Sequence, residues 1–261
     1  DADLELQRTF FGFAEIHPRG TPYNTGYCLR ILQKAGAELW HLRNFGQSGG
    51  IWPGIRIPGV ASALLRRQLW TTWSWLEIAA DDARFYDEGA PLHHTHYKER
   101  RHGWWVDTPH SQAMPVHMLF DEHTRRHNCL VTRSMSWATV VEGHRWSEDN
   151  ADEVAKGWIL AADSIEALAA KMGRDPRRVR ATVDRYHDAC RQGRDADFGR
   201  APHTLQPLQE PPYYAVQLVP TIVCTSRGAK RNNESEVLTR LGTPIPRLYE
   251  AGGIGSMSSH L

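Results

Sequence analysis

The sequence has no excess charge of either sign and no long apolar segment. Its 31 Lys and Arg residues nearly balance its 30 Asp and Glu residues, so no net field attracts nucleic acid or an anionic membrane. None of its apolar runs is long enough to span a membrane as a helix. We therefore expect a protein that binds neither nucleic acid nor a membrane.

Paired cysteines are also missing. The four cysteines are widely spread, and no two of them form a C-x-x-C pair: Cys28, Cys129, Cys190 and Cys224. This spacing is typical of reduced thiols and not of a disulfide framework. Reduced thiols indicate a cytoplasmic location.

A complete dinucleotide-binding unit is the third absence. Such a unit consists of a strand, the glycines of G-x-G-x-x-G, a helix and an acidic residue about twenty positions later. The nearest match is Gly253–Ser258, where serine stands at the third glycine position. Neither a helical segment nor an acidic residue follows it in the sequence. We therefore expect this chain to contain no Rossmann unit.

Histidine is unusually abundant, at 14 residues. Eight of the histidines lie between His93 and His127, and His123 and His127 have the i,i+4 spacing of a helical pair. The flanking pattern of H-E-x-x-H is missing, so we expect no metal site there.

Tryptophan is abundant as well, at 10 residues, and five of them lie close together in the sequence: Trp70, Trp73, Trp75, Trp104 and Trp105. Tryptophan in such numbers indicates either a large core or an aromatic-walled pocket. Both interpretations stay open at this point. A pocket of this kind suits an apolar substrate, such as a polycyclic or aromatic molecule.

Helices and strands are both predicted. Three- and four-residue apolar spacing predicts helices over 25–42, 61–80, 148–159, 163–172 and 175–192. Thr25, Asp163 and Asp175 are the expected N-caps. Gly173 and Gly193 are the expected helix ends. Runs of β-branched and aromatic residues predict strands over 213–225, 236–238 and 248–251, the last of them buried.

The region after Glu210 contains four short segments in a fixed order: PPYYAV (211–216), TSRG (225–228), VL (237–238) and PIPRLYEAG (244–252). In this order they resemble the C-terminal part of the FAD-dependent fumarate reductase and 3-ketosteroid dehydrogenase flavoproteins. In that family the segment returns to the FAD-binding lobe after a domain that caps the substrate.

Three more segments resemble the same family. NTGYCLRILQKAGAELWHL (24–42) is similar to the family's helix beside the FAD. DARFYDE (82–88) is similar to the turn that begins the substrate-facing part of the cap. The run from Ser164 to Arg200, which ends in DFGR, is similar to the helical pair that closes the cap.

The resemblance implies an α+β protein: a flavoprotein cap, or substrate, domain together with returning β-strands of an FAD-binding lobe, the N-terminal Rossmann unit being absent. The implied boundaries are 1–53 for a partial FAD-lobe segment, 54–210 for the cap domain and 211–261 for the returning segment. We expect a fragment or one half of a split enzyme. Its expected partners are a second chain that supplies the FAD lobe, or further copies of itself.

The resemblance implies FAD as the cofactor, with these residues beside it: Thr25, Gly26, Thr225, Gly228, Gly252, Gly253, Gly255 and Ser256. His260 is the implied proton donor. The family pattern is broken at three positions that face FAD: Tyr27–Cys28 replaces Asp-Gly, Arg227 replaces a glycine and Gly253 replaces a glutamate. We therefore expect that this chain alone does not retain FAD.

The implied activity is hydride transfer between FAD and a small-molecule substrate, an apolar or cyclic organic compound. Fumarate is not expected as a substrate, because Leu92 stands where the family's fumarate reductases have their proton-donating arginine. The alternative from another class is a cofactor-free binding or interaction module that uses the tryptophan-rich cap surface.

Overall fold

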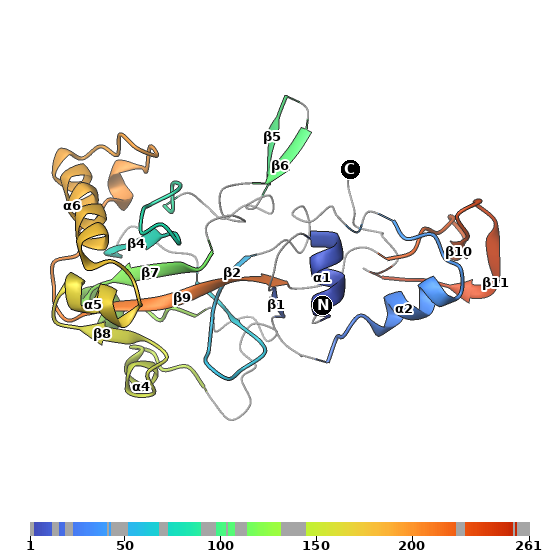
Figure 1. Ribbon diagram of the computed structural model, residues 1–261, viewed down its shortest axis with the longest axis horizontal. Helices are drawn as coiled ribbons and strands as arrows, with labels where there is room; N and C mark the ends of the chain where they lie inside the picture. The colour runs from blue at the N-terminus through green and yellow to red at the C-terminus, as the bar shows by residue number, and fades with distance from the viewer. Residues whose placement is uncertain are drawn as a thin grey trace.

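The computed structural model of the chain describes residues 3–11, 16–18, 23–40, 42, 52–67, 73–89, 98–102, 104–107, 114–131, 145–222, 228–252 and 254. Its helices are α1 (Leu4–Phe11), α2 (Tyr27–Lys34), α3 (Glu122–His127), α4 (Ala151–Ala155), α5 (Ile165–Lys171) and α6 (Pro176–Gln192), with a 3₁₀ turn at Pro202–Thr204. Its strands are β1 (His17–Pro18), β2 (Trp52–Ile55), β3 (Leu64–Leu65), β4 (Trp75–Ile78), β5 (Lys98–Arg101), β6 (Trp104–Asp107), β7 (Val116–Phe120), β8 (Leu160–Ala162), β9 (Tyr213–Ile222), β10 (Glu236–Leu238) and β11 (Pro244–Tyr249). Figure 1 shows an elongated molecule, with α6 near one end and β10 and β11 near the other.

Seven of the described strands form one sheet at the centre of the fold, and β9 is its central strand (Figure 1). The strand order is β3-β2-β9-β7-β4, and β1 and β8 also pair with β9. β9 runs antiparallel to β2, β7 and β8 and parallel to β1. The strand predicted over 213–225 is thus confirmed as far as Ile222, and it has partners on both edges.

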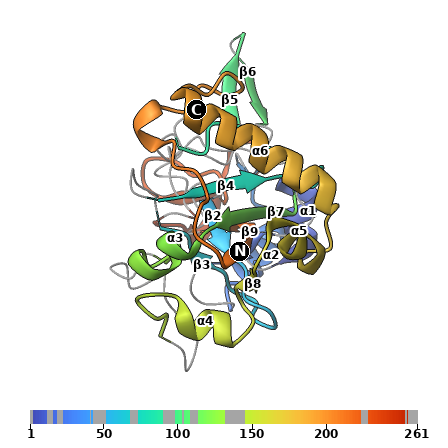
Figure 2. The ribbon, with the colours of Figure 1, turned by 90° about the vertical axis from the view of Figure 1, so that its left-hand side faces the viewer.

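Both faces of this sheet are buried, as neighbouring residues of β4 and β7 show. Trp75 and Phe120 pack into one core. Leu76 and Leu119 pack into another, to which α5 and α6 contribute apolar side chains. Figure 2 shows α5 and α6 beside β4, β7 and β9. Successive side chains of a strand alternate between the two faces, so each of these strands supplies both cores.

The helix predicted over 61–80 is wrong, because β3 and β4 lie there. The four consecutive residues of β4, Trp75–Ile78, are all buried. A strand that is covered on both faces is apolar without a break, so it lacks two-residue alternation and mimics helical spacing. The helix predicted over 148–159 is also too long, since only Ala151–Ala155 is helical.

The helical pair predicted over 163–192 is confirmed as α5 and α6, with one change of cap. Ser164, and not Asp163, caps α5, because the Ser164 side chain accepts a hydrogen bond from a first-turn amide. The Asp175 side chain caps α6 as predicted. Gly193 ends α6 in the left-handed region, with a φ of 62°.

α2, β10 and β11 form a small end lobe with its own core. Leu32 of α2 packs there with Ala229 and Val237. The helix predicted over 25–42 stops at Lys34, and Leu39 forms a β-bridge with Ala229 instead of continuing the helix. The end lobe is therefore part helix and part β-hairpin.

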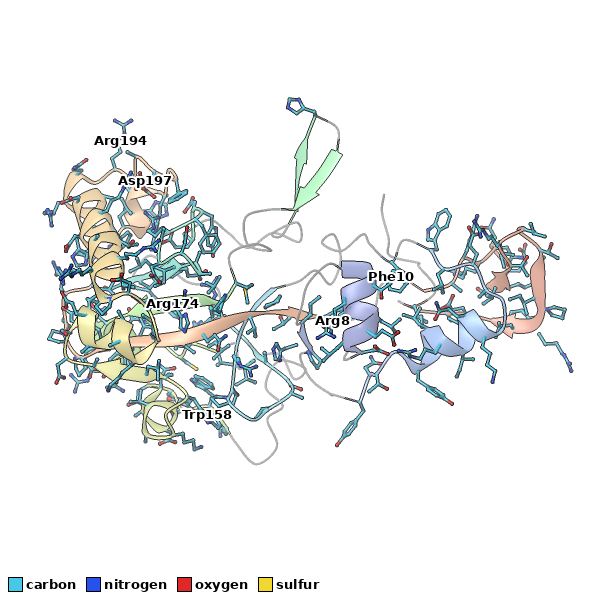
Figure 3. The ribbon with its side chains drawn as sticks, viewed as in Figure 1. Arg8, Phe10, Trp158, Arg174, Arg194 and Asp197 are labelled. Carbon is cyan, nitrogen blue, oxygen red and sulfur yellow. The ribbon has the colours of Figure 1, made fainter. Side chains whose placement is uncertain are left out.

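α1 lies between the helical end of the molecule and the end lobe. Figure 3 labels Arg8 on α1, with Arg174 and Asp197 at the end that α5 and α6 occupy. A surface ion pair joins α1 to the end lobe, since Nη2 of Arg30 in α2 lies 2.6 Å from Oδ2 of Asp3, just before α1. The end that contains α5 and α6 and the end lobe are well separated along the long axis of the molecule (Figure 1).

The strand predicted over 248–251 is present but shifted, and its predicted burial is wrong. It is β11, which pairs antiparallel with β10 and has no buried residue. Within the described residues the hairpin of the end lobe consists of these two strands, so β11 is left with one covered face at most. The apolar residues Leu248 and Ile245 are only half-buried there.

Candidate functional site

Three segments of the chain meet at Gly228. A Cβ atom at this position would lie 2.2 Å from the carbonyl oxygen of Ile254 and 2.7 Å from Glu250 Oε1. The backbone N–H of Trp40 donates a hydrogen bond to the Gly228 carbonyl oxygen over 2.8 Å. Because the neighbouring backbone comes so close, no larger residue fits without a shift of these segments. We call this contact the Gly228 junction, formed by Trp40, Gly228, Glu250 and Ile254.

Glu250 ties the junction together. Its Oε2 atom accepts a hydrogen bond from the backbone N–H of Ala229 at 3.2 Å. Only 6% of Glu250 is exposed. Burial raises the pKa of its carboxyl, against the opposing effects of the Ala229 hydrogen bond and the charge of Arg231. Sequence reasoning missed Glu250, although a single acidic residue between a strand and a glycine loop was a usable signal.

The start of α2 leaves backbone donors uncapped. Gly26 is the N-cap, and its left-handed φ of 74° suits glycine. The predicted cap, Thr25, is wrong: Thr25 lies one residue before the cap and is exposed. Since no side chain among the described residues caps this helix start, its first amide groups can serve an anionic group such as a phosphate.

The end-lobe core connects these two features. Leu32 of α2 packs with Ala229, next to Gly228, and Ile254 packs against the same core. Gly252 is exposed and has a φ of 75°. The structure therefore places Gly26, Gly228 and Gly252 in one lobe. The other predicted site residues lie outside the described residues, and their roles stay predictions: Thr225, Gly253, Gly255, Ser256 and His260.

The predicted cap turn at 82–88 contains a buried cluster of charges. Arg84 Nε and Nη2 donate to the two Glu88 oxygens at 2.8 and 2.6 Å, and Nη2 also donates to Asp195 at 2.9 Å. Arg200 Nη1 lies 3.4 Å from Glu88 Oε1. Burial alone lowers the pKa of Arg84, but its bonds to Glu88 and Asp195 raise that pKa overall. The cluster fixes this predicted turn against the segment 195–200.

The tryptophans that the structure describes near the cap turn belong to the core. Trp73 and Trp75 are 0% and 1% exposed and pack in the same apolar cluster. The pocket interpretation is therefore wrong for these two. Trp70 lies outside the described residues, and so do the side chains of Trp104 and Trp105.

His123 and His127 lie together on α3, with 4.9 Å between the ring centroids. Among the described residues, no group of three or more His, Cys, Asp or Glu side chains is arranged to hold a metal ion. In the same part of the chain no helix has the length and apolar character needed to cross a membrane. Cys28, Cys129 and Cys190 form no disulfide with any residue that the structure describes.

Residues 88–260 match the family described as "FAD binding domain". The chain belongs to this family. FAD is the cofactor that this membership implies. The matched region contains Gly228, Glu250 and Ile254 of the Gly228 junction and the strands β7, β8 and β9 of the central sheet. The family resemblance read from the sequence is confirmed.

The curated proteins that are similar to this chain have the names of oxidoreductases. Digoxin reductase of Eggerthella lenta is 43% identical over 95 residues, which are 36% of this chain and 17% of that protein. NADH:fumarate oxidoreductase of Klebsiella pneumoniae is 32% identical over 146 residues, which are 54% of this chain and 14% of that protein. The chain thus matches less than a fifth of the length of either relative.

A solved structure shows the same fold over nearly the whole chain. The crystal structure of 3-ketosteroid delta1-dehydrogenase from Sterolibacterium denitrificans has a TM-score of 0.66 and 18% sequence identity to this chain. The alignment covers 95% of this chain and 44% of that protein. This likeness confirms the α+β fold class at the level of the shared architecture.

The residues that the structure describes fit part of what FAD requires. The uncapped start of α2 suits a phosphate oxygen, and the Gly228 junction keeps side chains away from a backbone segment of the same lobe. The G-x-G-x-x-G turn that normally receives the pyrophosphate is not among the 261 residues. The fit is therefore that of a contributing surface and not of a whole site.

Proposed function

We propose that this chain is the substrate-capping part, with its returning segment, of an FAD-dependent oxidoreductase. The observation that carries this proposal is the fold shared with a 3-ketosteroid dehydrogenase over 95% of the chain, together with the family match over residues 88–260. The FAD lobe with G-x-G-x-x-G is proposed to come from further sequence or from a second chain. When bound, FAD supplies hydride transfer to or from a substrate carbon.

The central strand supports a mechanical role for this chain. β9 pairs with β7 in the central sheet at Tyr214–Leu218. A few residues after the end of β9 at Ile222, the same stretch of chain reaches the Gly228 junction. A cap that is joined so directly to the cofactor side can hold a substrate against the flavin and exclude water from the reacting atoms. The buried Arg84 cluster keeps the cap turn rigid in this arrangement.

The proposed substrate is an apolar or cyclic organic small molecule. Support comes from the names of similar proteins, which include a digoxin reductase and a 3-ketosteroid dehydrogenase. The core position of Trp73 and Trp75 removes them from the substrate wall, so the substrate class rests on these similarities.

A reconstitution experiment tests the proposal. The chain is co-expressed with an FAD lobe taken from a close relative, purified as a complex, and examined by visible spectroscopy. A flavin band that co-purifies, with turnover of a 3-ketosteroid in the presence of an artificial electron acceptor, is the expected result. A complex that forms but stays colourless would favour the alternative, a cofactor-free interaction module.

A further inference from the structure

Large apolar side chains are exposed mainly on the end lobe and next to it. Seven such side chains are exposed among the described residues: Leu4, Tyr23, Tyr27, Ile31, Phe198, Leu241 and Tyr249. All except Phe198 lie in α1, in or just before α2, or in the β10–β11 hairpin. A single exposed apolar residue is ordinary on a protein surface, whereas a group of them at one end marks an interaction surface.

α2 is apolar on two opposite sides. Leu29 and Leu32 are each 6% exposed, and Leu32 packs in the core of the end lobe. Tyr27 and Ile31 are 72% and 47% exposed, and their i,i+4 spacing places them together on the side away from these leucines. Tyr23, which is 85% exposed, lies four residues before Tyr27. We call these three exposed residues the outer face of α2. A helix that is apolar on both sides is typical of a position between two layers.

The end lobe is too small to be stable without cover. Its core contains three buried residues among those that the structure describes: Leu32, Ala229 and Val237. α2 has eight residues, and β10 and β11 form a two-stranded sheet. Helices and hairpins of this size are marginally stable in water when they stand alone. We therefore expect a further layer to pack on the outer face of α2.

β11 does not suit a partner that adds a strand. Pro244 and Pro246 of β11 have no backbone N–H to donate, and Arg247 has a left-handed φ of 62°. Strand addition uses a continuous row of N–H and C=O groups along an extended edge. The covering layer is thus expected to pack on side chains of α2, and two copies of this chain are not expected to join through β11.

The partner follows from what this chain lacks, and this step rests on the proposed function. The chain covers 44% of the solved 3-ketosteroid delta1-dehydrogenase that shares its fold, and G-x-G-x-x-G is not among its 261 residues. A second copy of the chain lacks that turn as well, so a homodimer leaves the proposed enzyme incomplete. The outer face of α2 also belongs to the lobe that contains the Gly228 junction, which the proposed function places on the cofactor side.

We propose that the outer face of α2 is the surface on which the FAD lobe docks. An apolar face of that lobe packs on Tyr23, Tyr27 and Ile31 and completes the end lobe as the middle layer of three. Tyrosine is enriched among the residues that dominate the energy of protein interfaces. Removal of the apolar character of this face should therefore separate the two parts, whether or not flavin is bound.

The test co-expresses the full chain with a tagged FAD lobe from a close relative and measures how much chain the lobe retains. Tyr27→Lys/Ile31→Lys is expected to lower the retained amount at least about tenfold, because two central apolar contacts are replaced by charges. Both side chains are exposed, so urea unfolding of the variant chain alone is expected to match that of the parent.

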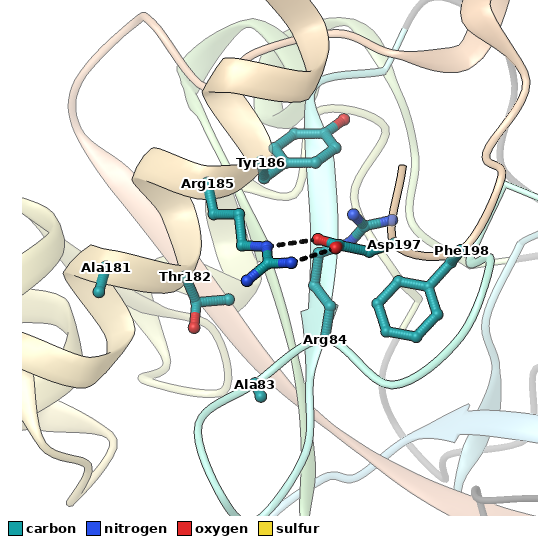
Figure 4. A pocket seen from close by; sticks show the side chains of 8 residues that line it. All are labelled: Ala83, Arg84, Ala181, Thr182, Arg185, Tyr186, Asp197 and Phe198. Carbon is teal, nitrogen blue, oxygen red and sulfur yellow. Dashed lines mark hydrogen bonds and ion pairs between the residues drawn. The ribbon is translucent and has the colours of Figure 1, made fainter. Parts of the chain in front are cut away.

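Phe198→Lys is the matched control. Phe198 is also exposed, but it lies near the opposite end of the molecule, beside Arg84 and Asp197 (Figure 4), and the Arg84 guanidinium is 5.2 Å from its ring centroid. The tagged lobe is expected to retain this variant like the parent. A second readout is nitration of tyrosine mapped by mass spectrometry. Tyr23 and Tyr27 are expected to react in the chain alone and to be protected in the complex.

The outcomes separate this proposal from the proposed function. A coloured complex that Tyr27→Lys/Ile31→Lys leaves intact overturns the docking surface and leaves the proposed function standing. A colourless complex that the double variant abolishes supports the docking surface and contradicts the FAD-dependent function. Absence of any complex with the parent chain overturns the docking surface. Self-association of the parent chain in light scattering, lost in the double variant while lobe binding persists, overturns it too and assigns the outer face of α2 to a second copy.

Discussion

Arg66 and Glu77 form an ion pair inside the central sheet: Arg66 Nη1 lies 2.6 Å from Glu77 Oε1, and the two side chains are 2% and 1% exposed. The Tyr86 hydroxyl donates to Glu77 Oε2 at 2.6 Å. The Arg66 guanidinium also lies 5.3 Å from the ring centroid of Trp75. Each charge is thus cut off from water, and each depends on the other for compensation.

Removal of Glu77 alone should destabilise the protein strongly. Glu77→Leu leaves Arg66 buried without a counter-charge, and the free energy of unfolding in urea is expected to fall by about 3–5 kcal/mol. The double variant Arg66→Met/Glu77→Leu should regain most of this loss, since no charge is then buried.

Asp184→Asn is the control for this experiment. It breaks an ion pair with Arg180 whose side chains are 40% and 53% exposed, so a change within about 0.5 kcal/mol is expected. A Glu77→Leu protein as stable as the parent would show that the buried pair contributes nothing.

His117 is expected to make the free energy of unfolding depend on pH. Burial, helped by the charge of Arg174, lowers the pKa of His117 to about 4, and Arg174 Nη2 lies 3.2 Å from His117 Nδ1. The unfolded state, with a histidine pKa of about 6.5, binds more protons between these values. The stabilisation that the depressed pKa of His117 provides is therefore complete above about pH 6.5. As the pH falls below this value, the free energy of unfolding decreases, by about 3 kcal/mol at pH 4.

His117→Gln should remove this dependence. The measurement compares urea unfolding of parent and variant from about pH 7 to about pH 4, where the parent is expected to lose more stability on acidification than the variant. Parallel curves for the two proteins would show that His117 titrates normally.

Replacement of Gly228 by alanine is expected to lower the stability of the protein, because the Gly228 junction is closely packed. Gly228→Ala places a methyl group within 2.2 Å of the Ile254 carbonyl oxygen, and such overpacking costs about 1–3 kcal/mol. Hydrogen exchange is expected to speed up in the end lobe, around Val237, more than in the central sheet.

Gly242→Ala serves for comparison. Gly242 has a φ of 78°, and a Cβ atom added there would meet no described atom within 4 Å, so the substitution adds only backbone strain of about 1 kcal/mol. If both variants change hydrogen exchange equally, close packing at Gly228 is not the cause.

The 261 residues expressed alone should not retain FAD. The sequence lacks G-x-G-x-x-G and its helix, so the pyrophosphate has no helix start of that kind to bind. The protein is incubated with FAD and desalted, and its visible spectrum is recorded. A stoichiometric flavin band would contradict the prediction.

The reconstituted enzyme should not reduce fumarate. Leu92, which lies outside the described residues, has no charge or proton to offer a dicarboxylate, and an unpaired carboxylate loses solvation at a cost of several kcal/mol. Fumarate turnover with chemically reduced flavin is the assay. A rate of about one per second or faster would refute the role assigned to Leu92.

Local signals in the sequence were sufficient for the helical pair α5–α6 and for β9. Capping residues, a proline in the first turn and a glycine at the end are properties of single segments. The same reasoning failed at β4, because its burial on both faces depends on α6 and on strands far away in the chain. It also missed the hydrogen bond between Arg84 and Asp195, which are 111 positions apart.

For the candidate site, too, local sequence signals were predictive and contacts between distant residues were not. The order of short segments identified the family, since order is a property of the sequence itself. The closeness of Glu250 to Gly228 was not predicted, because it arises from the way two loops fold onto each other. Contacts between distant segments can be identified only when the positions of the elements that carry them are known.

The central position of β9 has a consequence for biosynthesis. β1, β2, β7 and β8 all pair with β9, yet all four precede it in the sequence. While the ribosome adds the intervening residues, these strands have no central partner, and their open edges are prone to wrong pairing. Folding of the sheet is therefore expected to wait until Ile222 has left the exit tunnel, and to be slow because its contacts are distant in sequence.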